Sequence, residues 1–127
     1  MNENNIAAII VDCAYQIHVK TGPGLFESVY EAILEEYLKR RGLSVKRQVI
    51  IPVQFENIEF NKAFVADLIV NDMVVIELKS KPSIGDIDKK QLLTYVKLTG
   101  YKLGILINFG DALIKNGIKR IINGEIK

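Results

Sequence analysis

Three charged residues interrupt two otherwise apolar segments of the chain, and these are the side chains best suited to chemistry. Asp67 lies within residues 63–70, and Glu77 and Lys79 lie within residues 73–79. Burying an unpaired charge is costly, so such groups need partners or a metal ion. Two carboxylates beside a lysine suit Mg²⁺ or Mn²⁺, which prefer oxygen ligands and acidify bound water. The alternative is an ordinary ion pair between Glu77 and Lys79, with Asp67 near a turn.

The two carboxylates can converge only if their strands pair in one register. Side chains alternate between the faces of a strand, and Glu77 and Lys79 therefore share one face. A strict two-residue turn at Asn71-Asp72 would send Asp67 and Glu77 to opposite faces. We therefore predict one extra residue in the connection, which places Val70 opposite Val74 and Asp67 opposite Glu77.

The remaining elements follow from the spacing of apolar residues. A helical period predicts helices over residues 3–19, 26–41 and 86–99. An alternating pattern predicts a first strand over residues 45–53, and a short apolar run predicts a last strand over residues 103–108, followed by a helical turn and an edge strand. The order α-α-β-β-β-α-β predicts one α/β domain over residues 1–127, with a mixed sheet flanked by helices.

Composition narrows the class of protein. The chain is 49% hydrophobic, which is sufficient for a packed core, and its net charge of +2 does not by itself indicate nucleic-acid binding. The single cysteine excludes an internal disulfide framework and a cysteine-based zinc site. The longest apolar runs are too short to cross a membrane, and the N-terminus lacks the pattern of a secretory signal. We therefore expect a soluble cytoplasmic protein with no membrane partner.

Five short motifs, in order along the chain, resemble the GxxExxY family. The signature itself matches Gly24-Leu25-Phe26-Glu27-Ser28-Val29-Tyr30, and the others are residues 66–70, 76–79, 91–95 and 104–109. The likeness covers roughly residues 18–122. This family resembles a branch of the PD-(D/E)XK nuclease-like superfamily, and its Gln-x-x-x-Tyr helix is similar to that of RecB-like exonucleases. The resemblance implies a restriction-endonuclease-like core, in which a helix precedes an antiparallel three-stranded meander, a crossover helix and a further strand.

The resemblance also implies roles for individual residues. Asp67, Glu77 and the carbonyl of Leu78 would be ligands of Mg²⁺ or Mn²⁺, and Lys79 would be the catalytic lysine. Glu27, from the preceding helix, would reach the metal directly or through water.

Gln91 and Tyr95 lie four residues apart, so they share one face of their helix. By the same resemblance they would contact the substrate phosphate or orient the site.

The activity implied is hydrolysis of phosphodiester bonds in DNA or RNA by a metal-dependent nuclease. One alternative is a non-catalytic nucleic-acid-binding or protein-interaction module that retains the fold. Another is a subunit that is active only in a larger assembly. At 127 residues the domain lacks elements that grip a long duplex, which makes a homo-oligomer or a larger complex plausible.

Overall fold

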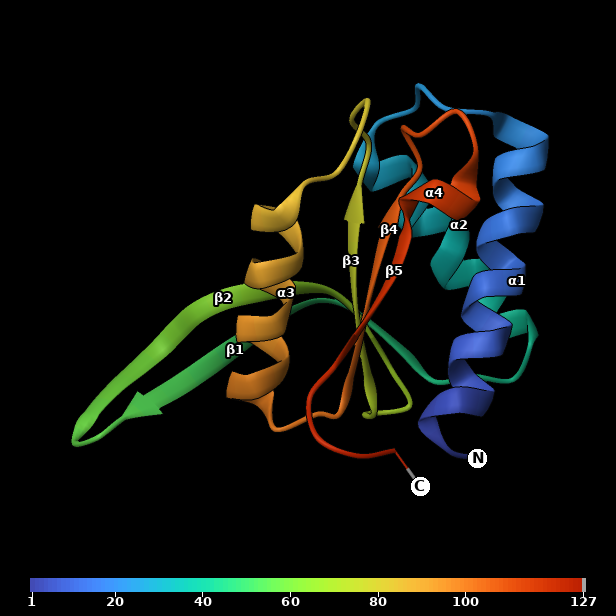
Figure 1. Ribbon diagram of the computed structural model, residues 1–127. Helices are drawn as coiled ribbons and strands as arrows, with labels where there is room; N and C mark the ends of the chain where they lie inside the picture. Colours follow the sequence, from blue (N-terminus) through green and yellow to red (C-terminus); the bar gives the residue numbers. More distant parts are fainter. Residues whose placement is uncertain (127) are drawn as a thin grey trace.

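The computed structural model describes residues 1–126, which form a five-stranded sheet between two layers of helices (Figure 1). The elements in chain order are α1 (Glu3–Thr21), α2 (Glu27–Arg40), β1 (Val45–Phe55), β2 (Ile58–Val70), β3 (Val74–Lys79), α3 (Asp86–Thr99), β4 (Leu103–Asn108), α4 (Ile114–Gly117) and β5 (Ile118–Ile122). The predicted order is confirmed, including the helical turn and the edge strand of the tail.

The strands follow one another across the sheet in the order β1-β2-β3-β4-β5. The first three form an antiparallel meander, whereas β3 and β4 are parallel and joined by α3. The last strand, β5, returns antiparallel beside β4. The predicted fold class, a mixed sheet of the restriction-endonuclease-like type, is confirmed.

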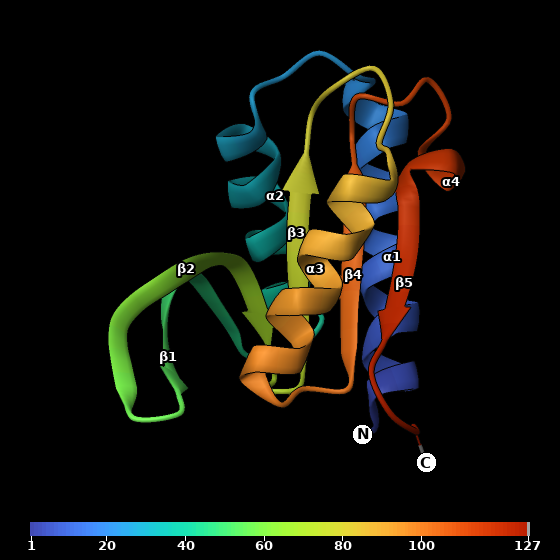
Figure 2. The same ribbon diagram turned by 60° about the vertical axis from the view of Figure 1, so that its left-hand side comes forward.

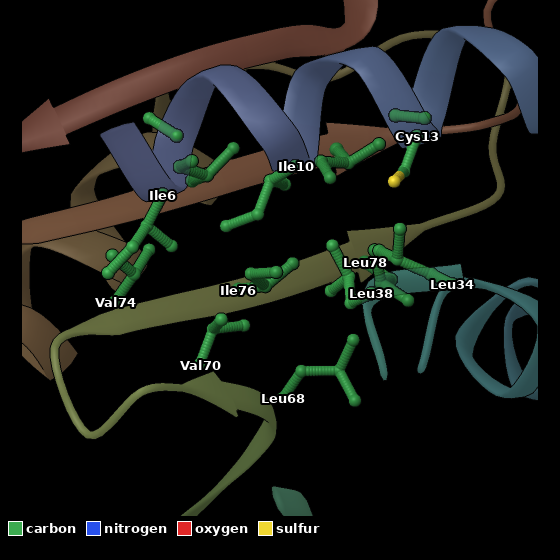
Figure 3. Packing of buried hydrophobic residues seen from close by; sticks show 14 of the residues in the cluster. Ile6, Ile10, Cys13, Leu34, Leu38, Leu68, Val70, Val74, Ile76 and Leu78 are labelled. Carbon is green, nitrogen blue, oxygen red and sulfur yellow. The ribbon is translucent and has the colours of Figure 1, made fainter. Parts of the chain in front are cut away.

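Helices cover both faces of the sheet (Figures 1 and 2), and each face has its own apolar cluster. On one face, α1 and α2 pack against β2, β3 and β4, and Figure 3 shows Ile10 and Leu34 directed toward Ile76 and Leu78. On the other face, Leu92 and Val96 of α3 pack against the sheet. Because both faces are covered, β3 and β4 are buried at nearly every position.

The connection between β2 and β3 has the predicted extra residue. Val70 pairs with Val74, and the ladder continues to Leu68 and Ile76. The intervening Asn71 and Asp72 both have a φ of 53°, the left-handed conformation that these two residue types tolerate best. The chain therefore enters β3 in the register that turns Asp67 and Glu77 to the same face.

The hairpin of β1 and β2 is longer than the sequence predicted and projects as an arm away from the sheet, beneath α3 (Figure 1). The arm includes Ile58 and Phe60, which lie before the predicted start of β2 at residue 63. Its β1 side shifts register between Ile51 and Val53, around Pro52. The sequence missed this part because the outer residues are exposed on both faces and show no alternating burial.

Within the described chain, no helix is both long and apolar enough to traverse a membrane.

Candidate metal and active site

The site is built where β2 separates from β3. The last rung of their ladder joins Leu68 to Ile76, and Asp67 comes next. There, Asp67 Oδ2 accepts a hydrogen bond of 2.8 Å from the backbone nitrogen of Leu78. The backbone nitrogen of Asp67 donates to Glu77 Oε1 at 3.4 Å. Side chains thus replace the regular ladder, and the two carboxylates predicted to converge lie together.

Burial makes Glu77 a poor place for a negative charge. The residue is only 8% exposed. The pKa of Glu77 is raised to about 8, chiefly by burial and next by the nearby charge of Asp67, while the hydrogen bond from the Asp67 backbone and the charge of Lys79 oppose the shift. A proton on Glu77 relieves the repulsion between the two carboxylates, and a cation bound to both would also relieve it.

The chemistry of the donors fits a hard divalent ion. Among residues 1–126, no cluster of three or more histidine, cysteine, aspartate or glutamate side chains is arranged to hold a metal. Mg²⁺, however, commonly binds through one or two carboxylates and completes its octahedron with waters and substrate phosphate. The pair formed by Asp67 and Glu77 meets that requirement.

Lys79 follows Glu77 on the same face and is half-buried. In the part of the chain that the structure describes, these two residues form no salt bridge, so the alternative of a simple ion pair is not observed. The charge of Lys79 nevertheless acts on its surroundings, because it lowers the pKa of Asp88 slightly, after the larger effects of Lys81 and of a hydrogen bond from the Gly85 backbone. Lys79 is therefore an available cation between the two acidic residues Glu77 and Asp88.

The end of β4 fixes the backbone that follows Lys79. The carbonyl of Lys79 accepts a hydrogen bond from the nitrogen of Phe109, at 2.9 Å. The buried amide of Asn108 accepts from the nitrogen of Lys81 at 3.0 Å and donates to its carbonyl at 2.8 Å. A Cβ on Gly110 would lie 2.2 Å from that carbonyl oxygen, so only glycine fits there.

The helix α3 brings Tyr95 to the acidic pair. The ring of Tyr95 stacks on Phe64 of β2, with ring centroids 3.9 Å apart. Its pKa is raised by burial and by the charges of Glu77 and Asp67, which places its hydroxyl within their electrostatic influence. Gln91 lies one turn earlier on the same helix and is exposed.

The sequence of residues 4–121 matches the model of the PD-(D/E)XK nuclease superfamily. This chain belongs to that superfamily. No curated protein and no solved structure matches it. PD-(D/E)XK nucleases generally use divalent metals and act on nucleic acids, which agrees with the carboxylate pair on the sheet.

Within residues 1–126, the third expected acid, Glu27, does not join Asp67 and Glu77 in a three-carboxylate cluster. Glu27 is the first residue of α2 and is exposed. Glu31, one turn later, is the acid of α2 that is buried, and it contacts β1 rather than β3. The role of Glu27 toward a metal, through water, therefore belongs to the proposal below.

Gln48, which the sequence did not single out, reaches the site from β1. Gln48 Nε2 donates to Asp67 Oδ1 at 3.3 Å and to Glu31 Oε1 at 2.6 Å. Arg47, the preceding residue of β1, donates from Nε to Glu31 Oε2 at 2.5 Å. The sequence feature that points to Glu31, the partner of both side chains, is its position four residues after Glu27 on the same helix.

A groove of about 530 Å³ adjoins the end of β3. One wall is the loop before α2 and the other is the segment after Lys79; the groove is lined by Gly24, Phe26, Glu27, Ser80, Lys81 and Pro82, among others. Ser80 ties the walls together, because its hydroxyl donates to the carbonyl of Leu25 at 2.7 Å. The buried hydroxyl of Tyr30 also fixes this loop, donating to the carbonyl of Gly22 and accepting from the nitrogen of Leu25.

Proposed function

We propose that this domain is a Mg²⁺- or Mn²⁺-dependent phosphodiesterase that cleaves DNA or RNA, and that it belongs to the GxxExxY branch of its superfamily. The observation that carries the proposal is the convergence of Asp67 and Glu77, with the raised pKa of Glu77, at the point where β2 leaves β3. A buried carboxylate beside a second carboxylate is unfavourable for folding alone, and a perturbed group such as Glu77 is typical of functional sites.

The carboxylates of Asp67 and Glu77 and the carbonyl of Leu78 would hold the ion, and Glu27 would contact it through water. When bound, the metal lowers the pKa of a water molecule and offsets charge on the phosphate. Lys79 would hold the attacking water or a phosphate oxygen from the same strand face.

Two residues of α3 complete the proposed site by positioning the substrate. Since the pKa of Tyr95 is raised, its phenol stays protonated and can donate a hydrogen bond to a phosphate oxygen. Gln91, exposed one turn earlier, would donate to the same or the next phosphate.

A calorimetric titration with Mn²⁺ tests the proposal most directly. We expect calorimetry to detect Mn²⁺ binding to the wild-type protein and none to an Asp67→Asn, Glu77→Gln double variant, because the amides remove both charges at nearly constant volume. The exposed Glu59→Gln is the matched control and should bind as the wild type does. Wild-type protein that binds no Mn²⁺, either alone or with a non-hydrolysable oligonucleotide, would contradict the metal site.

The groove beside β3 suggests where a single-stranded nucleic acid would bind. Phe26 is 82% exposed at the mouth of the groove, and exposed aromatic rings provide stacking platforms for unpaired bases. We expect Phe26→Ala to weaken binding of single-stranded oligonucleotides about tenfold, as measured by fluorescence anisotropy with Ca²⁺ present to prevent cleavage.

The control for that measurement is Phe55→Ala. Phe55 is also exposed, at 63%, but lies at the tip of the arm. Its loss should leave oligonucleotide binding unchanged. Equal effects of the two substitutions would show that the groove has no special role in binding.

The arm favours an assembly-dependent form of the proposed function. In this form the nuclease domain, residues 1–127, works within a homo-oligomer or a larger complex. Its outer part exposes Phe55, Ile58 and Phe60 together, an apolar surface that a partner could cover. Metal binding without cleavage by the isolated protein would support this assembly-dependent form over a nuclease active alone. Salt-sensitive nucleic-acid binding that survives loss of both carboxylates would instead support the non-catalytic module.

A further inference from the structure

Gln48 has a backbone conformation that is unusual for the middle of a strand. Its φ is 52°, in the left-handed region that residues with a side chain rarely adopt. On either side the pairing is regular, since Arg47 pairs with Leu68 and Val49 with Ala66. The rung between Gln48 and Asp67 is therefore the one that is missing. Strain of this kind persists only where the surroundings hold it in place.

The hydrogen bonds of the Gln48 side chain explain how this backbone conformation is held. Its Nε2 group lies between two carboxylates, donating to Glu31 Oε1 at 2.6 Å and to Asp67 Oδ1 at 3.3 Å. Carboxylates accept hydrogen bonds, and an NH₂ group has two hydrogens to give, so one amide can serve both. Glu31 is only 4% exposed, and its second oxygen accepts from Arg47. The acid that anchors Gln48 is thus itself held in place.

The result is a carboxylate with both oxygens fixed. Oδ1 of Asp67 accepts from Gln48, and Oδ2 accepts from the backbone of Leu78. Each oxygen retains a further lone pair that could coordinate a cation. Partners that fix the orientation of a metal-binding carboxylate typically contribute ten- to a hundredfold to metal affinity.

We propose that Gln48 is a positioning residue, which bridges Glu31 of α2 to Asp67 and holds the Asp67 carboxylate in its metal-binding orientation. The inference rests on the proposed function, in which Asp67 is a metal ligand. Gln48 itself does not contact the metal or the substrate. It acts through Asp67, and Glu31 and Arg47 act through Gln48.

The test uses Gln48→Gly, because glycine adopts a φ near 52° without strain and lacks the amide. We expect the folded variant to bind Mn²⁺ about ten- to a hundredfold more weakly than the wild type in calorimetry. Glu56→Gly is the matched control, since Glu56 has a φ of 55° at the exposed tip of the arm. That substitution makes the same backbone change far from the carboxylates and should leave Mn²⁺ affinity unchanged.

A second variant keeps the test decisive if Gln48→Gly does not fold. Asparagine tolerates the left-handed conformation but is one methylene shorter, so Gln48→Asn breaks the bridge between Glu31 and Asp67. We expect the same loss of affinity. Folded variants that bind Mn²⁺ within twofold of the wild type would overturn the positioning role and leave the proposed function intact. A wild-type protein that binds no Mn²⁺ overturns the proposed function, and this inference with it.

Discussion

Replacing Lys79 with methionine should reduce nucleic-acid cleavage about a hundred- to ten-thousandfold and leave the protein folded. Lys79 lies two residues beyond Glu77 on the face that carries the acidic pair, and it forms no salt bridge within residues 1–126. Methionine preserves the apolar stem of the side chain and removes only the charge. The loss should therefore appear in the rate of the chemical step rather than in stability.

Single-turnover cleavage in Mn²⁺ measures that rate, and thermal unfolding of the same preparation measures stability. Lys90→Met is the matched control, because Lys90 is exposed on α3. It should retain wild-type activity. If Lys79→Met unfolds while Lys90→Met does not, Lys79 has a structural role, and if Lys79→Met cleaves normally, the lysine is not part of the chemistry.

Replacing Glu77 with glutamine should stabilise the protein at alkaline pH and not at acidic pH. The pKa of Glu77 is raised from 4.5 to about 8 in the folded protein, chiefly by burial. Between those two values the folded chain holds a proton that the unfolded chain releases, so the free energy of unfolding falls as pH rises. Above pH 8 the buried charge costs the wild type on the order of a few kcal/mol, and the neutral amide avoids this cost.

Thermal unfolding in a chelator at pH 5 and pH 9 tests this expectation. At pH 5 the two proteins should unfold at similar temperatures, and at pH 9 the variant should unfold about 5 °C or more above the wild type. The exposed Glu59→Gln should show no such difference. If Glu77→Gln is equally or less stable than the wild type at pH 9, the Glu77 carboxylate is not destabilised by its surroundings as inferred.

The acidic pair could be predicted from the sequence because the features that indicate it are local. A charge in an apolar strand is conspicuous, and the two-residue period of a strand fixes which residues share a face. The requirement that Asp67 and Glu77 converge then predicted the length of the turn, and the observed pairing of Val70 with Val74 agrees with that prediction.

Gln48 could not be found in the same way, since its role depends on three elements. Its partners lie on α2 and β2, and nothing near it in the sequence indicates a positive φ, because glutamine has no preference for that conformation. The burial of Glu31 rather than Glu27 could not be predicted for the same reason. Both acids lie on one side of α2, and only the packing of that helix against β1 determines which is buried.

The contacts of Asn108 and Gly110 with Lys81 determine where this chain can accept an insertion. An insertion between β3 and α3, or just after β4, would break a set of contacts that joins residues 27 positions apart and that fixes the backbone after Lys79. The tip of the arm at Glu56 and Asn57 is exposed and joins only its own two strands. A fluorophore or an affinity tag inserted there would leave the carboxylates untouched.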